Sequence, residues 1–316
     1  MKTTGMLRIL GLSLVLLLCI DSSTLFAQDS DELLGRWNLT VRSAEATYPS
    51  WIEVRKSGNG TLVGAFVGRF GSARPISEVK YDGHAFTFSI PPQWEDRQSY
   101  ITYTGRLEGE GMVGTTTDDD GSTIYWKGSR SPKLKRDKAP EWGKAMALFN
   151  GEDIANWTTE FDNRPNGWVV MDGILVNKEP GNNLVSKEKF DDFKLHAEFR
   201  YPEGSNGGIY LRGRYEMQIE DNYGDEPESH KIGGIYGFLT PSVNAAKPAG
   251  EWQSVEVTLV GRVVTVILNG ERVIDRQTIP GATGGALDND EAMPGPIMLQ
   301  GDHGPIEFRK LEIVKG

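Results

Sequence analysis

Residues 207–221, which read GGIYLRGRYEMQIED, bring together side chains that could bind a sugar or transfer protons. On extended strands, successive side chains point to opposite faces of a sheet, so this stretch divides into an apolar set and a polar set. The apolar set is Ile209, Leu211, Met217 and Ile219, and the polar set is Tyr210, Arg212, Glu216, Gln218 and Glu220. Two carboxylates, a guanidinium, an amide and a phenol on one face suit carbohydrate binding and general acid/base chemistry. A sheet face that is merely solvated fits the same pattern, and this stretch alone leaves both interpretations open.

A second polar cluster follows near the C-terminus, where residues 299–304 read LQGDHG. Gln300 and Asp302 are candidate substrate-binding residues and His303 a candidate catalytic residue, because an imidazole beside a carboxylate can exchange a proton near neutral pH. An Asp/His pair with a structural role is the alternative. Trp252 is a further candidate for substrate binding, since an indole can stack on a sugar ring.

A divalent metal ion is an optional cofactor in this interpretation, with Glu220, Asp221 and His303 as candidate ligands. Carboxylates and imidazoles bind such ions, and a Lewis acid would polarise a ketone. No compact ligand motif accompanies these residues, so an oxygen-rich site without a metal remains the alternative. His230, after an acidic stretch, is a second histidine that could line the mouth of a cleft.

The elements that must position these residues are predicted to be strands. Short apolar runs separated by turn residues indicate an all-β protein with two domains, residues 31–130 and 144–316, joined by a basic, proline-containing linker over 131–143. In the first domain, strands are expected over 37–41, 51–56, 61–67, 76–81, 85–90, 99–107, 112–117 and 123–127. Sequential strands of this kind form an up-and-down meander, either a barrel or a sandwich. The opening Gly35-Arg36-Trp37 resembles the start of lipocalin-like barrels.

Composition limits the partners. The formal net charge is −10 over 316 residues, and a basic surface that would bind nucleic acid or anionic lipid is lacking. We therefore expect neither partner.

Residues 1–27 have the features of an export signal that is cleaved. Lys2 and Arg8 flank a short apolar run, and Leu25-Phe26-Ala27 precedes the expected cleavage point. The run is too short to remain across a bilayer, and the only cysteine, Cys19, lies within it. We expect an exported protein, periplasmic or extracellular, that is not inserted in the membrane after cleavage and has no disulfide.

Motifs in the second domain follow one another in a recognisable order. They read LFNGED at 148–153, WVVMDGIL at 168–175, FKLHAEFR at 193–200, GEWQ at 250–253 and LNG at 268–270. Together with 207–221 and 299–304, this series resembles the 3-keto-disaccharide hydrolase family of exported bacterial proteins over about residues 145–316. The resemblance implies a concanavalin A-like jelly-roll sandwich that carries carbohydrate on its concave face.

The resemblance also implies a reaction. A ketone at C3 of a glycoside makes the hydrogen on C2 acidic, so a base can remove it and the C1 substituent can leave. Glu216 or Glu220 would be the base, Arg212 or Gln300 would stabilise the enolate-like oxygen, and His303 would protonate the leaving group or hold a metal. Addition of water would complete a net hydrolysis of a 3-keto-glycoside.

Two alternatives remain from the sequence. The domain could bind carbohydrate without catalysis, as lectin-like sandwiches do. It could also be a retaining endo-glucanase, since EMQIE at 216–220 resembles the Glu-x-Asp-x-Glu strand of laminarinase-type glycosidases, with Gln218 in place of the central aspartate.

Overall fold

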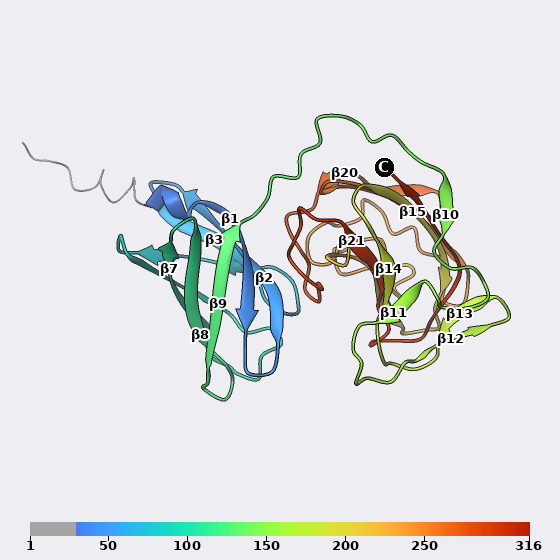
Figure 1. Cartoon of the computed structure of the whole chain (residues 1–316), viewed down its shortest axis with the longest axis horizontal. Helices are drawn as coiled ribbons and strands as arrows, with labels where there is room; N and C mark the ends of the chain where they lie inside the picture. The colour runs from blue at the N-terminus through green and yellow to red at the C-terminus, as the bar shows by residue number, and fades with distance from the viewer. Residues whose placement is uncertain (1–29) are drawn as a thin grey trace, which may run out of the picture.

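The computed structural model describes residues 30–316, and the expected export signal, residues 1–27, lies outside them. Over the described part the fold is all-β, as predicted, with 22 strands and one short 3-10 helix, η1 (Asp31–Leu33). Within residues 30–316, no helix is long and apolar enough to cross a membrane. Two β units lie side by side, and the segment that joins them arches from β9 (Thr123–Arg130) to β10 (Ala145–Ala147) (Figure 1).

The N-terminal unit is a nine-stranded antiparallel sheet curled into a nearly closed barrel, with strand order β4-β3-β2-β1-β9-β8-β7-β6-β5. Besides β9, its strands are β1 (Gly35–Arg42), β2 (Thr47–Ser57), β3 (Thr61–Val67), β4 (Arg74–Ile76), β5 (Val79–Tyr81), β6 (Ala85–Ile90), β7 (Ile101–Glu108) and β8 (Gly111–Thr117). The two ends of the sheet approach each other, β3 and β4 against β5 and β6. The run expected as one strand over 76–81 forms two, because a bend at Ser77 carries the chain from one edge of the sheet to the other.

Aromatic side chains fill much of the barrel interior. Phe66 lies 4.6 Å from Tyr103 between ring centroids, and Tyr103 stacks on Phe88 at 5.0 Å. Contacts between β3, β6 and β7 of this kind hold the two ends of the sheet together and give the barrel its own hydrophobic core.

The C-terminal unit is a sandwich of two antiparallel sheets. The back sheet has the order β12-β13-β22-β15-β18-β19-β20, with β10 paired to β22, and the front sheet has the order β11-β14-β21-β16-β17. The back strands are β12 (Trp168–Met171), β13 (Ile174–Asn177), β15 (Phe193–Arg200), β18 (Gln253–Val260), β19 (Val263–Leu268), β20 (Glu271–Thr278) and β22 (Ile306–Lys315). The front strands are β11 (Trp157–Thr159), β14 (Leu184–Phe190), β16 (Asn206–Leu211), β17 (Tyr215–Glu220) and β21 (Gly295–Leu299). The expected jelly-roll sandwich is confirmed.

Alternation along the front strands separates the core from the site. The inward side chains Ile209, Leu211, Met217, Ile219, Ile297 and Leu299 are all buried between the sheets. Burial of each such side chain contributes about 1.5–3 kcal/mol. Tyr210 and Glu216 face each other across β16 and β17, and both point to the opposite side, toward the barrel.

The two units meet at residues 279–294, which connect β20 to β21 and are called the interdomain loop below. Trp51 of the barrel donates its indole N–H to the carbonyl of Ala282 at 2.7 Å, and the rings of Trp51 and Phe238 lie 5.9 Å apart. The backbone N–H of Gly285 donates to the carbonyl of Arg69 at 2.9 Å. The interdomain loop therefore lies between the barrel and the front sheet and contacts both.

Candidate functional site

A cavity of about 640 Å³ lies between the front sheet and the barrel. Its lining includes the polar face of β16 and β17, residues 300–303, the interdomain loop and part of the barrel. The volume falls within the range of about 300–1,000 Å³ that is usual for small-molecule sites. Another cavity, of about 720 Å³, lies on the barrel and is lined by none of the predicted site residues.

Glu216 is the most perturbed acid in this cavity. Its side chain is buried, and burial raises the pKa of the carboxyl to about 8, against opposing effects of Tyr210 and His303. The hydroxyl of Tyr210 lies 3.0 Å from Oε2 of Glu216 and also 3.0 Å from the carbonyl oxygen of Gly284. A Cβ on Gly208 would lie 2.6 Å from Oε1 of Glu216, so only glycine leaves room for this carboxyl. A buried carboxyl with this pKa can act as a base or an acid near neutral pH.

His303 and Asp302 form a hydrogen-bonded pair of titratable groups in the cavity. Nδ1 of His303 lies 2.6 Å from Oδ1 of Asp302, and this hydrogen bond raises the pKa of His303 against the effect of burial. Burial would raise the pKa of Asp302, but the hydrogen bond and the positive charges of His303 and Arg164 outweigh it and lower that pKa. The pair therefore favours a protonated imidazole beside an ionised carboxylate.

Two glutamines present polar groups that the protein leaves unused. Gln218 and Gln300 line the cavity and are almost fully buried. Within residues 30–316 the Oε1 atom of each has no hydrogen-bond partner, while Nε2 of Gln218 donates to Asn206 at 3.3 Å. Because an unpaired buried polar atom is costly, both Oε1 atoms are available to accept hydrogen bonds from a ligand or from water.

The structure adds cavity residues that the sequence did not single out. Glu160 accepts a hydrogen bond from Nδ2 of Asn183 at 2.7 Å, and burial raises the pKa of its carboxyl. Arg164 and Tyr236 also line the cavity. Glu160, Arg164 and Tyr236 lie in segments without strand periodicity. No local sequence pattern distinguishes them from ordinary loop residues.

Arg212 lies outside the cavity, contrary to its prediction as a substrate-binding residue. The strand β16 ends at Leu211, and Arg212 is the first residue of the turn, with φ of 56°. Its side chain is 0% exposed and donates to Asp191 at 3.1 Å and to the carbonyl of Gly261 at 3.4 Å. Strand alternation therefore no longer applies at this position, and Arg212 has a structural role.

Trp252 also lies elsewhere. Its ring packs between the guanidinium groups of Arg200 and Arg309, at 4.8 and 4.4 Å, on strands of the back sheet. His230 packs edge-on against Tyr236 at 4.8 Å between ring centroids and does not itself line the cavity.

The three candidate metal ligands do not converge. Glu220 ends β17 outside the cavity, near Lys231, and Asp221 accepts a hydrogen bond from the backbone of Gly204 at 2.8 Å. His303 lies in the cavity, paired with Asp302. Within the described residues, no group of three or more His, Cys, Asp or Glu side chains is placed to hold a metal ion.

Comparisons with known proteins identify the family of the C-terminal unit. Residues 144–314, more than half of the chain, match the family model of the 3-keto-alpha-glucoside-1,2-lyase-like domain. A 3-keto-disaccharide hydrolase from Bacteroides thetaiotaomicron is 20% identical over 166 residues, which are 41% of this chain and 57% of that relative. The chain thus spans less than two thirds of the length of this curated relative.

Two solved structures also show similarity. A candidate glycosyl hydrolase from Parabacteroides distasonis is 30% identical with a TM-score of 0.47, covering 54% of this chain and 84% of that chain. The carbohydrate-binding module CBM66 from Bacillus subtilis is 13% identical with a TM-score of 0.35, covering 50% of this chain and 94% of that chain. The match over residues 144–314, which agrees with the prediction from the sequence motifs, shows that the chain belongs to the 3-keto-alpha-glucoside-1,2-lyase-like family of carbohydrate-active proteins.

Proposed function

We propose that this protein cleaves 3-keto-glycosides by elimination across C1 and C2, followed by addition of water. The observation that carries the proposal is the buried Glu216 carboxyl, whose pKa of about 8 suits a base at neutral to mildly alkaline pH, in a cavity shared with His303. The family match and the unpaired Oε1 atoms of Gln218 and Gln300 support a sugar as the ligand.

The chemistry can be written with these residues. Ionised Glu216 removes the proton from C2, which the C3 ketone has made acidic, and the electrons form a C1=C2 double bond as the C1–O bond breaks. The departing oxygen takes a proton from His303, and an N–H of Gln300 stabilises negative charge on the C3 oxygen. Water then adds its hydroxyl to C1 and gives its proton to His303, while the Glu216 carboxyl, whose proton has by then exchanged with solvent, protonates C2. The sum is hydrolysis, with no net oxidation.

A retaining glycosidase is less well supported. Such an enzyme uses two carboxyl groups about 5–5.5 Å apart on either side of the bond that is cleaved. In a retaining glycosidase, Glu220 would be the second carboxylate beside Glu216, but Glu220 is not among the residues that line the cavity.

Isotope incorporation tests the reaction. The purified protein would be incubated in D₂O with 3-ketotrehalose and, separately, with trehalose, and the products followed by NMR. Elimination and rehydration are expected to release glucose from the keto sugar only, with one deuterium at C2 of the 3-keto product. Cleavage of trehalose itself, or release of glucose without deuterium at C2, would contradict the proposal.

We also propose that the chain is exported, on the basis of the leader over residues 1–27. Expression in a Gram-negative host is expected to yield a chain outside the cytoplasm that begins at Gln28, as read by N-terminal sequencing. Recovery of the uncleaved chain from the cytoplasm would contradict this.

A further inference from the structure

The cavity is completed by the barrel, a part of the chain that lies outside the family match at 144–314. Four of the barrel residues at its wall have aromatic rings or a guanidinium group. They are Tyr48, Arg69, Phe70 and Trp94. Phe70 and Trp94 are 52% and 68% exposed, so their rings are accessible to a ligand in the cavity.

These four side chains form a surface suited to a sugar ring. The guanidinium of Arg69 lies 5.6 Å from the centre of the Tyr48 ring and 5.0 Å from that of Phe70, within the range of cation–π contact with both rings. Aromatic faces pack against the C–H groups of a pyranose, and a guanidinium donates hydrogen bonds to its hydroxyls. Carboxylates and amides are on the other side of the cavity, so one site has two chemically different walls.

The barrel wall is connected to the acid/base group by close contacts. A Cβ on Gly71, whose φ is +80°, would lie 2.4 Å from Nε1 of Trp94, and a Cβ on Gly284 would lie 2.5 Å from the carbonyl oxygen of Gly71. The carbonyl of Gly284 in turn lies 3.0 Å from the hydroxyl of Tyr210, the hydrogen-bonding partner of Glu216. Glycine at positions 71 and 284 thus brings the barrel wall close to the catalytic face.

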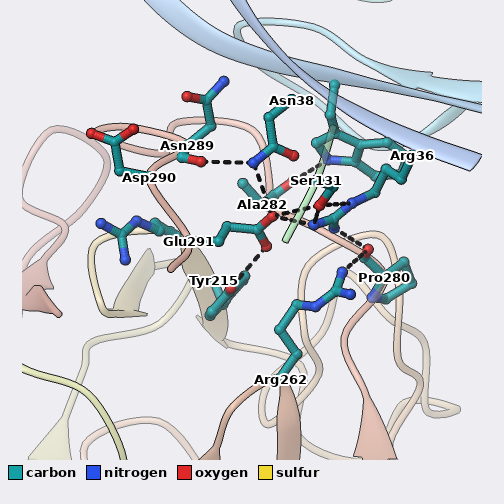
Figure 2. Close-up of polar contacts among 12 residues, drawn as sticks. Arg36, Asn38, Ser131, Tyr215, Arg262, Pro280, Ala282, Asn289, Asp290 and Glu291 are labelled. Atoms are coloured by element: carbon teal, nitrogen blue, oxygen red, sulfur yellow. Dashed lines mark hydrogen bonds and ion pairs between the residues drawn. The ribbon is translucent and has the colours of Figure 1, made fainter. Parts of the chain in front are cut away.

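Contacts between the units hold this wall in place. Arg36 of β1 forms an ion pair with Glu291 of the interdomain loop, and both side chains are buried (Figure 2). Nδ2 of Asn38 donates to the carbonyl of Asn289 at 2.7 Å, and Nδ2 of Asn289 donates to that of Leu39 at 2.5 Å. A buried ion pair and reciprocal amide contacts fix the barrel relative to the sandwich more firmly than exposed contacts would.

We propose that Tyr48, Arg69, Phe70 and Trp94 form the subsite for the second sugar ring of the substrate, the ring that leaves from C1. The proposal rests on the proposed function for the position of the reacting ring, which lies against Glu216 and His303. The barrel is then part of the substrate-binding site, and it makes the protein select disaccharides over glycosides with a small leaving group.

The test uses binding, so it does not depend on turnover. Full-length protein with Glu216→Gln would be titrated by calorimetry with 3-ketotrehalose and with methyl 3-keto-α-glucoside, which has the same oxidised ring and no second sugar. The disaccharide is expected to bind at least about tenfold more tightly, as one well-placed ring contact allows. Adding Phe70→Ala and Trp94→Ala to this protein is expected to abolish the difference and leave the affinity for the methyl glycoside unchanged.

The matched control is Tyr125→Ala, which removes another exposed aromatic ring of the barrel, 63% exposed and outside the cavity. It is expected to keep the preference for the disaccharide. Equal affinity of the Glu216→Gln protein for the two ligands, or a preference that survives loss of Phe70 and Trp94, would overturn the subsite. The binding preference could depend on Phe70 and Trp94 while the unsubstituted protein cleaves no keto sugar. This outcome would overturn the proposed reaction and leave the subsite standing.

Discussion

Replacing Glu216 with glutamine is expected to lower the rate of 3-keto-glycoside cleavage by about 10²–10⁴-fold, the usual contribution of a positioned general base. Glutamine has nearly the same shape and can still accept the hydrogen bond from Tyr210, which lies 3.0 Å from the carboxyl, but it cannot take the proton from C2. Single-turnover release of glucose from 3-ketotrehalose, together with deuterium incorporation at C2, measures the effect.

Glu220→Gln is the matched control for this variant. Glu220 is four residues further along the same strand, so it has the same orientation relative to the sheet, yet it lies outside the cavity. Glu220 is only partly exposed, and we expect the cleavage rate of the Glu220→Gln protein to remain within about threefold of the unsubstituted protein, since substitutions away from a site rarely have large effects. Equal losses in the two variants would show that the base has been assigned to the wrong residue.

The pKa of Glu216 adds a dependence on pH to the same comparison. Burial raises this pKa from 4.5 to about 8, so between these values the folded protein keeps a proton that the unfolded chain releases. The stabilising contribution of the protonated form is complete below about pH 4.5 and is lost as the pH rises through about 8, at about 1.4 kcal/mol per pH unit. The Glu216→Gln protein has no such titration. The difference in free energy of unfolding between this variant and the unsubstituted protein is therefore expected to shift in favour of the variant from about pH 4.5 to about pH 8 and to stay constant above that pH. Urea denaturation at several pH values measures the difference.

The activity is expected to have the opposite dependence on this group, because in the proposed reaction the ionised form of Glu216 is the base. The value of kcat/KM is expected to rise with pH as the carboxyl, with its pKa of about 8, ionises, and to fall as His303, whose pKa is raised by Asp302, loses its proton. The residue that we propose as the base is therefore expected to lower stability at the pH where it would act.

The polar face of the front sheet could be predicted from the sequence because alternation is a local property. Tyr210, Glu216 and Gln218 lie within β16 and β17, where side chains alternate regularly, and they share a face as expected. Arg212 occupies the same period in the sequence but lies in the turn, whereas Glu220 keeps the expected orientation at the last position of β17 and lies outside the cavity. Alternation predicts direction only within a strand, and strand ends are the least certain part of such a prediction.

The other wall of the cavity could not be predicted. Arg69, Phe70 and Trp94 belong to loops of a separate unit and come near Glu216 only because the barrel docks on the interdomain loop. Glu291, which forms the central contact of that docking, sits in an acidic, irregular stretch that looks like a solvated loop in the sequence. Contacts between two separately folded units produce no periodic pattern in the sequence of either unit.

The ion pair between the units leads to the second large effect that we expect. Glu291 is 1% exposed and accepts hydrogen bonds from Arg36, Asn38, Ser131 and Tyr215. Glu291→Leu leaves the buried guanidinium of Arg36 without its carboxylate, and loss of one partner of a buried pair costs about 3–5 kcal/mol. Urea denaturation is expected to show a loss of this size, and the KM for 3-ketotrehalose is expected to rise because the barrel wall is no longer held in place.

Two further variants separate docking from general destabilisation. Glu108→Leu removes a carboxylate from an exposed ion pair with Arg106 on the same barrel and is expected to cost less than about 1 kcal/mol. Arg36→Met combined with Glu291→Leu removes both buried charges, and its free energy of unfolding is expected to lie closer to that of the unsubstituted protein than the single variant does. If the single and double variants were equally destabilised, the cost would come from lost packing of the loop rather than from an unpaired charge. If Glu291→Leu were instead as stable as Glu108→Leu, the ion pair would not hold the two units together, and the barrel wall would need another anchor to serve as a sugar subsite.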